Sequence, residues 1–245
     1  MANYLIIAGT SSIGRVVAQK LLSTNNGVFI TGRDQNKTSQ LAQDLNVPYS
    51  IGDAIDFNWV DSTFELAKLE MGSLYGVVNC AGSLLLQPAH LTNQKSYDQI
   101  ISANLTTAFA VTRAAGKHLT TEGGSVVLIS SAAAITGITN HEAIAAAKAG
   151  IIGLTFSAAA TYAPHRLRFN AIAPGLVETS LTSKLTATPL SRKASESMHA
   201  LGRLGNPQDI AAGILFFLNP DNDWVTGQIL AIDGGLSRIH PKMKI

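Results

Sequence analysis

The chain has 245 residues, and only 14% of them are Asp, Glu, Lys or Arg, compared with about 25% in typical soluble proteins. Hydrophobic residues reach 46% but aromatic residues only 6%, so the apolar side chains are mainly Ala, Val, Ile and Leu. This composition excludes a disordered chain and favours strands that are covered on both faces. A net charge of +2, without basic runs interleaved with aromatic residues, argues against a nucleic-acid partner.

Cysteine content and apolar runs bear on the compartment. Cys80 is the only cysteine, so an intrachain disulfide is excluded and a reducing, cytoplasmic location is expected. The first apolar run ends at Ala8, too early for a signal peptide, and the least charged stretch, Ala149–Ala163, is shorter than a membrane span. We therefore expect no membrane partner. The mildly basic C-terminal tail is expected to be a solvated terminus: Arg238, His240, Lys242, Lys244.

Short apolar runs alternate with helical patterns along the chain. The first helical pattern places Ile13, Val17 and Leu21 on one face. This alternation predicts parallel strands joined by right-handed crossovers, hence an α/β fold with a Rossmann-type, doubly wound sheet between two helical layers. The predicted strands are Leu5–Ala8, Val28–Thr31, Gly76–Asn79, Ser125–Ser130, Arg168–Ile172 and Ile229–Ile232, with a weaker one at Tyr49–Gly52.

One segment interrupts the alternation. Residues Glu178–Gly205 are polar and rich in Ser and Thr, and they lie between a predicted strand and the last predicted helix. A segment of this kind above the carboxyl ends of the strands is a candidate substrate lid. No linker or repeat divides the chain, so residues 1–245 are expected to form one domain that carries this lid.

The turn after the first predicted strand reads Ala-Gly-Thr-Ser-Ser-Ile-Gly over residues 8–14. Small residues let the backbone approach a pyrophosphate at a helix N-terminus, where free N–H groups and the helix dipole favour anions. The same residues would also suit a tight turn that binds nothing. The candidate phosphate-binding residues are Gly9, Ser11, Ser12, Ile13 and Gly14.

The second predicted strand leads into Arg33, nineteen residues beyond Gly14. In dinucleotide-binding folds an acidic residue near this place reads the ribose 2′-hydroxyl, whereas an Arg accommodates a 2′-phosphate. Arg33 therefore favours NADP(H) over NAD(H) as the cofactor, because guanidinium binds phosphate in a bidentate manner. The alternative is a solvated arginine whose charge is neutralised by Asp34.

Further short motifs follow in a fixed order: Asn79-Cys80-Ala81-Gly82, Asn104, Ser130-Ser131, Lys148, Pro174-Gly175-Leu176-Val177-Glu178-Thr179, Gly202-Arg203-Leu204-Gly205-Asn206-Pro207, Thr226-Gly227-Gln228 and Asp233-Gly234-Gly235. In this combination the chain resembles the classical short-chain dehydrogenase/reductase family over essentially its whole length. The resemblance implies a seven-stranded Rossmann sheet, a nicotinamide above the strand ends, and a homodimer or homotetramer.

The resemblance also implies roles for single positions. Asp53 matches the adenine contact, and Asn104, Ser131 and Lys148 match three members of the catalytic tetrad. Asn104 could instead kink a helix, Ser131 could cap a strand end, and Lys148 could snorkel to solvent. The remaining cofactor positions are Asn79, Ala81 and Gly82, where Cys80 replaces the second Asn of an Asn-Asn-Ala-Gly motif, Lys148, and the carboxamide-binding Pro174, Gly175, Val177 and Thr179.

The glycine turn departs from the family pattern Gly-x-x-x-Gly-x-Gly. Aligned without a gap, Ala8 and Ser12 replace the first two glycines and only Gly14 remains, whereas a one-residue deletion would keep Gly9 and Gly14. Both alignments keep small residues in the turn. Cofactor binding is therefore expected to persist with reduced affinity.

A second departure concerns the proton donor, which the family places four residues before the lysine and thirteen after the serine. Both spacings lead to Ile144, which cannot transfer a proton. Loss of such an acid typically costs about 10²- to 10⁴-fold in rate. His141 is an alternative donor, because it lies two helical turns before Lys148 in a spacing that resembles the Tyr-x6-Lys of related enoyl reductases. It could instead face solvent in the loop before the helix.

Two functions remain in competition. The first is an NADP(H)-dependent oxidoreductase with atypical proton donation, acting on a carbonyl or on a conjugated enoyl substrate for which Ser131, Asn104 and Lys148 supply an oxyanion hole. The second is a catalytically inert, dinucleotide-binding homologue that serves as a sensor or partner subunit. No metal is expected in either case.

The sequence also bears on the substrate and on assembly. Leu84–Pro88, Ala132–Thr136 and Glu178–Gly205 are expected to line a pocket for a small to medium, largely apolar substrate. The predicted helix from Ala143 to Tyr162 has Lys148 as its only charged residue, so several of its faces must be covered, and the resemblance implies a dimer interface there.

Overall fold

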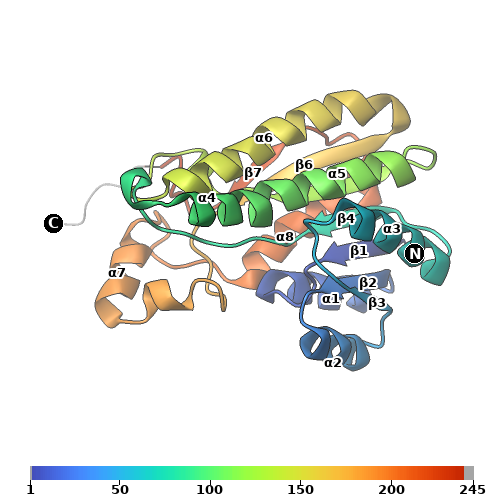
Figure 1. Ribbon diagram of the computed structural model, residues 1–245, viewed down its shortest axis with the longest axis horizontal. Helices are drawn as coiled ribbons and strands as arrows, with labels where there is room; N and C mark the ends of the chain where they lie inside the picture. Colours follow the sequence, from blue (N-terminus) through green and yellow to red (C-terminus); the bar gives the residue numbers. More distant parts are fainter. Residues whose placement is uncertain (1, 240–245) are drawn as a thin grey trace.

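The computed structural model describes residues 2–239, which form a seven-stranded sheet between two layers of helices (Figure 1). All neighbouring strands are parallel, in the order β3-β2-β1-β4-β5-β6-β7. The predicted doubly wound α/β fold is therefore confirmed. The strands are β1 Asn3–Ile7, β2 Gly27–Gly32, β3 Tyr49–Ile51, β4 Gly76–Asn79, β5 Gly124–Ile129, β6 Leu167–Pro174 and β7 Ile229–Ile232.

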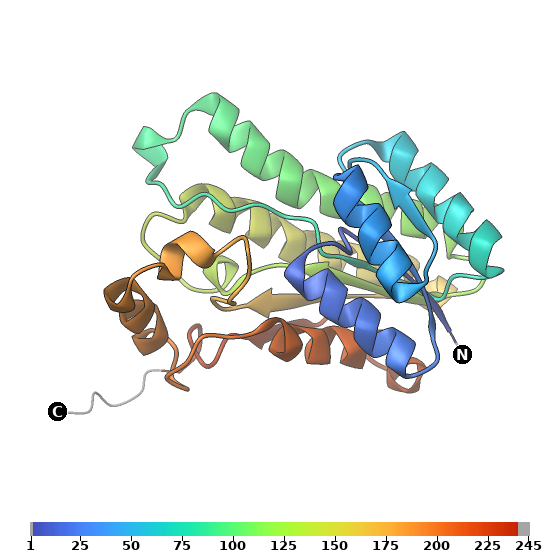
Figure 2. The ribbon, with the colours of Figure 1, turned by 90° about the horizontal axis from the view of Figure 1, so that it is seen from below.

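Two apolar clusters, one on each face of the sheet, explain the layers. One cluster joins the sheet to α3, α5 and α6, with Phe64 and Phe169 among its fully buried side chains. The other joins the opposite face to α1, α2 and α8, and Figure 2 shows α1 and α8 side by side. The longer helices are α1 Ser12–Ser23, α2 Gln35–Leu45, α3 Phe57–Met71, α4 Gln94–Ile101, α5 Thr107–His118, α6 Glu142–Tyr162, α7 Pro189–Ser197 and α8 Pro207–Leu218.

Strand order reverses between β1 and β4, and this reversal positions the site. The chain runs from β1 outward to β2 and β3, then returns to pair β4 with the other side of β1. The loops after β1 and β4 consequently leave the sheet in opposite directions and open a crevice at the strand ends. All eight residues of β6 are buried, as expected for a strand covered on both faces.

Helix α6 is longer than the uncharged stretch Ala149–Ala163 that the sequence analysis singled out as too short for a membrane span. The helical segment Glu142–His165 has 24 residues and is long and apolar enough to cross a bilayer by length and composition alone. Here 44% of its most apolar window is buried, and the helix packs against β6 and α5. A core helix of a layered α/β domain has the same properties.

The predicted lid segment is partly helical. Residues 178–205 contain a short 3-10 turn, Ser183–Thr186, followed by α7, and they project beyond the sheet at one end of the molecule (Figure 1). The base of the segment is closed where Val177 and Gly205 form an isolated parallel bridge. The lid therefore leaves and rejoins the domain at adjacent points. Three of the four basic-tail residues, His240, Lys242 and Lys244, lie outside the described residues.

Candidate active site

The turn between β1 and α1 depends on two glycines. A Cβ added at Gly9 would lie 2.9 Å from the Cβ of Ile30, and one at Gly14 would lie 2.7 Å from the carbonyl oxygen of Ala8. Ala8 itself has a φ of 56°, a left-handed conformation that favours glycine. In the alignment without a gap, Ala8 takes the place of the first family glycine and is strained. Gly9 and Gly14 let the turn pack closely against β2 and against the start of α1.

A polar cavity of about 430 Å³ opens between this turn and the ends of β2, β3 and β4. Ser11, Arg33, Asp53, Ala81 and Gly82 line it, as do Thr10, Lys37 and Trp59. The other predicted residues of this region support the cavity from outside its lining: Gly9, Ser12, Ile13, Gly14 and Asn79. Ser11 caps α1, because its Oγ accepts the N–H of Gly14 at 3.1 Å.

Charged side chains form the outer rim of the polar cavity. Arg33 pairs with Asp53, at 3.7 Å between Nη1 and Oδ2, and 75% of the Arg33 side chain is exposed. Asp34 instead caps α2 by accepting the N–H of Lys37 and lies 3.7 Å from the Lys37 ammonium. The expectation that Asp34 neutralises Arg33 is therefore wrong, because the partner is Asp53. Exposed pairs of this kind contribute about 0–1 kcal/mol, so Arg33 can exchange partners at little cost.

The end of β4 brings three predicted residues together. A Cβ added at Gly82 would lie 3.0 Å from Oδ1 of Asn104 and 3.6 Å from Nζ of Lys148. Asn79 holds the turn, since its Oδ1 accepts the N–H of Ala81 at 3.0 Å. Burial raises the pKa of the neighbouring Cys80 thiol to about 12, so Cys80 stays protonated. The absence of a side chain at Gly82 thus allows Asn104 and Lys148 to lie close to the backbone at the end of β4.

Asn104 lies in a π-helical segment, Ser102–Thr106, between α4 and α5. Its Nδ2 donates to the carbonyl of Ile100 at 2.9 Å, and its Oδ1 accepts the N–H of Ser83 at 3.3 Å. The segment is a single π turn between two α-helices, a feature that frequently occurs at functional sites. Asn104 is 1% exposed.

Lys148 is buried in α6 and donates from Nζ to the carbonyl of Ile129 at 2.7 Å. The alternative that it snorkels to solvent is wrong. Burial lowers the pKa of Lys148 to about 8, although the neighbouring Cys80 opposes this shift. The ammonium is thus held beside Gly82 in a state that loses its proton at mildly basic pH.

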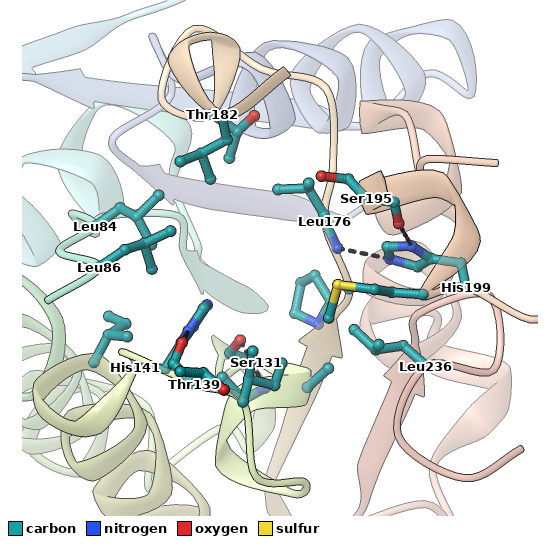
Figure 3. Close-up of a pocket in the computed structure, with 18 of the residues that line it drawn as sticks. Leu84, Leu86, Ser131, Thr139, His141, Leu176, Thr182, Ser195, His199 and Leu236 are labelled. Carbon is teal, nitrogen blue, oxygen red and sulfur yellow. Dashed lines mark hydrogen bonds between the residues drawn. The ribbon is translucent and has the colours of Figure 1, made fainter. Parts of the chain in front are cut away.

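A second, apolar cavity of about 650 Å³ lies between the sheet and the lid (Figure 3). Its lining residues, all within the described part of the chain, include no carboxylate, lysine or tyrosine. The predicted pocket segments contribute Leu84, Leu86, Ala132 and Ala133 together with residues of the lid. The lining residues that sequence reasoning missed are Gly137, Ile138, Thr139 and Leu236. The pocket suits a neutral, largely apolar molecule.

Ser131 and Ile144 lie on the floor of the apolar cavity. Ser131 Oγ accepts the N–H of Ala133 at 3.1 Å. The serine therefore caps the short 3-10 turn Ala132–Ala134 that follows β5. Its hydroxyl hydrogen remains available to a ligand. Ile144 is 3% exposed and packs with Ile100 and Ala147 while contributing to the cavity wall.

His141 immediately precedes α6 and lines the apolar cavity beside Ser131 (Figure 3). It lies in the loop before the helix and is only half-buried, so it borders both the cavity and solvent. Its Nδ1 lies 2.7 Å from the carbonyl oxygen of Thr139. A carbonyl can only accept, so Nδ1 carries a hydrogen and the neutral ring keeps a lone pair on Nε2.

The predicted carboxamide-binding segment continues from β6. Gly175 donates its N–H to the carbonyl of Ile232 at 3.1 Å, and Pro174 and Gly175 line the apolar cavity. Val177 belongs to the bridge with Gly205, and Thr179 donates its N–H to Thr182 Oγ1 at 3.0 Å. Val177 and Thr179 are not among the lining residues of either cavity described above.

The sequence placed His199 only within the predicted pocket segment Glu178–Gly205 and gave it no role of its own, yet it is buried at the end of the lid and lines the apolar cavity. Nothing in the local sequence marks it. Its environment arises only when the lid returns to the ends of β6 and β7, so a pattern of neighbouring residues could not have identified it.

Comparisons with known sequences agree with this arrangement. A family model described as enoyl-(acyl carrier protein) reductase matches residues 7–237. The chain is 29% identical over 242 residues to the 3-oxoacyl-(acyl-carrier-protein) reductase FabG of Aquifex aeolicus, covering 95% of this chain and 96% of that protein. It is 32% identical over 242 residues to the FabG of Thermotoga maritima, with the same coverage of both chains.

Solved structures give the same result. A short-chain type dehydrogenase/reductase from Mycobacterium ulcerans matches with a TM-score of 0.93 at 27% identity, covering 98% of this chain and 91% of that chain. The structure of ElxO with NADP bound matches with a TM-score of 0.90 at 30% identity, covering 96% of this chain and 98% of that chain. The similarity therefore extends over both cavities and the lid.

Proposed function

Because the chain belongs to the short-chain dehydrogenase/reductase family, we propose that it is an NADP(H)-dependent oxidoreductase acting on a carbonyl or conjugated enoyl substrate. The observation that carries this proposal is the approach of Asn104 and Lys148 to Gly82, between the polar cavity and the Ser131 floor of the apolar one. A nucleotide and an apolar substrate would meet at this place.

The polar cavity fits a dinucleotide phosphate. Gly9 and Gly14 keep the backbone close to the first turn of α1, whose N–H groups lack intrahelical partners and attract phosphate. Arg33 and Lys37 supply positive charge for a ribose 2′-phosphate, and the NADP-bound ElxO structure supports this preference. When bound, the nicotinamide supplies or accepts the hydride.

Proton transfer falls to His141 in this proposal, because Ile144 cannot perform it. The Thr139 carbonyl orients the ring through Nδ1 and leaves Nε2 to act toward the cavity. The protonated ring can donate from Nε2 to a developing alkoxide, and the neutral ring can accept the proton of an alcohol. Ser131 donates a hydrogen bond to the same oxygen.

A conjugated enoyl thioester would place a smaller demand on His141. Hydride addition to carbon then gives a delocalised oxyanion that hydrogen bonds from Ser131 and Lys148 could stabilise. The amide hydrogens of Asn104 are donated to Ile100 and Ser83, so Asn104 would support this site through the backbone. The apolar cavity, without a charged side chain in its lining, suits the acyl part of such a substrate. The strength of the proton donor therefore decides between a carbonyl and an enoyl substrate more than the shape of the pocket does.

Steady-state assays with NADPH test this function against the inert alternative. The substrates are a 3-oxoacyl thioester, an enoyl thioester and a simple apolar ketone, and consumption of NADPH is the readout. We expect turnover of at least one substrate, and a loss of about 10²-fold in kcat for ketone reduction in His141→Phe with unchanged NADPH affinity. Tight NADPH binding without turnover of any substrate would favour the sensor or partner subunit.

We also infer a single-domain, cytoplasmic protein that forms a homodimer or homotetramer. Phe109 of α5 and Phe156 of α6 are about half exposed, at 49% and 52%, which supports an interface on this side of the molecule. Light scattering on the eluted protein tests the assembly. A mass equal to one subunit would contradict it.

A further inference from the structure

We propose that His199 is a positioning residue that holds the lid against the cofactor-binding segment at the end of β6, and so couples lid closure to nucleotide binding. The coupling to nucleotide rests on the proposed function. The attachment of the lid by His199 is argued from the hydrogen bonds of the ring and from the small number of other buried residues in the lid.

The imidazole of His199 bridges two backbone groups. Its Nε2 lies 3.1 Å from the N–H of Leu176, and its Nδ1 lies 2.8 Å from the carbonyl oxygen of Ser195 (Figure 3). An amide N–H only donates and a carbonyl only accepts, so the ring is neutral and carries its hydrogen on Nδ1. One hydrogen bond reaches the segment after β6, and the other reaches the end of α7.

The surroundings fit the ring closely. A Cβ added at Gly175 would lie 2.8 Å from Nε2 of His199, and one added at Gly234 would lie 3.4 Å from its Cβ. Glycine at position 175 therefore allows the imidazole to reach the backbone of Leu176. His199 is 4% exposed, so its hydrogen bonds are shielded from water.

The lid before His199 has no comparable buried anchor among its described residues, 178–198. Within residues 178–200, all of which the structure describes, His199 is the only buried residue. Helix α7 has no buried residue, although Ser191, Ala194 and Ser195 face the apolar cavity. Closer to the base of the lid, Leu204 is buried and Leu201 donates its N–H to the carbonyl of Gly234 at 3.0 Å. The part before His199 can therefore open without disturbing the core, because few buried contacts are lost.

The hydrogen bond between His199 and Leu176 depends on the protonation state of the ring. A second proton on Nε2 would place two donors face to face at Leu176 and break that hydrogen bond. Asp233, after the end of β7, is the carboxylate that packs against the ring. Burial opposes the charge of Asp233, but hydrogen bonds from Ser237 and Gly235 outweigh burial and hold its pKa below the usual value.

Within the described residues 178–205, four charged side chains form ion pairs, whereas Lys184 and Lys193 form none. Arg192 and Glu196 of α7 form an ion pair at 2.9 Å, and Arg192 also pairs with Glu178. Arg203, between the lid and α8, pairs with Asp209 at 2.7 Å. Asp233 is therefore the carboxylate in contact with the His199 site, and the hydrogen bond from Leu176 requires an unprotonated Nε2.

Limited trypsin cleavage at the lid tests this proposal, because Lys184, Arg192 and Lys193 lie within it. Cleavage rates of the full chain are compared, with and without NADPH, for wild type, His199→Phe and His199→Gln. Gln can accept from Leu176 and donate to Ser195, whereas Phe can do neither. Leu190→Ala, at a residue of α7 that is 81% exposed, is the matched control.

We expect His199→Phe to be cleaved about tenfold faster than wild type, to lose protection by NADPH and to show a raised KM for NADPH at an unchanged thermal midpoint. His199→Gln and Leu190→Ala should resemble wild type. Lowering the pH should raise the cleavage rate of wild type relative to that of His199→Gln. The pH dependence of trypsin itself cancels in the ratio of these two rates.

Equal cleavage of wild type and His199→Phe, both folded, would overturn the proposal. If His199→Phe does not fold, the ratio of wild type to His199→Gln across pH decides instead, and a constant ratio overturns it. Failure of wild type to bind NADPH would contradict the proposed function, while the cleavage rates without nucleotide would still decide whether His199 holds the lid.

Discussion

The two cavities of this protein are built from different kinds of groups. The polar cavity depends on backbone geometry at Gly9 and Gly14 and on the charged rim of Arg33 and Lys37. The apolar cavity is lined by aliphatic side chains, hydroxyls and two histidines, without a carboxylate, lysine or tyrosine among the described residues. Nucleotide binding is thus spread over many groups, whereas proton transfer depends on very few.

This difference has a physical consequence. A binding site made of many backbone contacts tolerates the change at Ala8, because each contact contributes modestly. A proton donor cannot be shared in this way, since one atom must lie within hydrogen-bond reach of the reacting oxygen. We therefore expect position 144 to affect activity far more than position 8 affects nucleotide binding.

The largest expected effect comes from supplying an acid to the apolar cavity. Ile144→Tyr places a hydroxyl on the floor beside Ser131, and we expect ketone reduction to rise by about 10²- to 10⁴-fold in kcat/KM. Ile144→Phe adds the same ring without the hydroxyl and is the control. Equal activity of the Tyr and Phe variants would show that the rest of the site is not assembled for reduction.

A substitution at Lys148 measures how much the buried ammonium lowers the free energy of unfolding. Because burial lowers its pKa to about 8, Lys148→Met should stabilise the free protein by roughly 2 kcal/mol below pH 8 while turnover falls. The folded chain holds this proton less tightly than the unfolded chain, so wild type regains stability as the pH rises above about 8 and the gain of the variant shrinks.

Chemical denaturation across pH measures this gain, with the exposed Lys20→Met as the control that should not vary. A gain of Lys148→Met that stays constant from neutral to strongly basic pH would contradict the assigned burial of the charge.

The smallest effect is expected at the turn of the polar cavity. Ala8→Gly removes a left-handed alanine, which relieves roughly 1 kcal/mol of strain and is only partly offset by the greater freedom of the unfolded chain. Thermal unfolding should show a small rise in stability. The same change at Ala146, on an exposed face of α6, should lower stability instead. A loss of stability at both positions would argue against strain at Ala8.

Local patterns were enough to predict the fold, whereas most of the site positions came from the resemblance to a known family. Apolar runs located the central strands because both of their faces are buried, whereas the edge strand β3 is partly exposed and gave a weaker pattern. Asn104 and Lys148 both lie close to Gly82 in the folded chain. Contacts that depend on the return of distant segments could not be predicted. The pairing of Arg33 with Asp53 joins the ends of β2 and β3, and the hydrogen bonds of His199 join the lid to β6.

The central claim is that the polar cavity is an NADP(H) site. Calorimetric titration of wild type and Arg33→Ala with NADPH and with NADH tests it most directly. We predict that wild type binds NADPH more tightly than NADH, and that Arg33→Ala weakens NADPH binding about tenfold while leaving NADH binding unchanged. Absence of binding of either nucleotide to wild type would contradict the account.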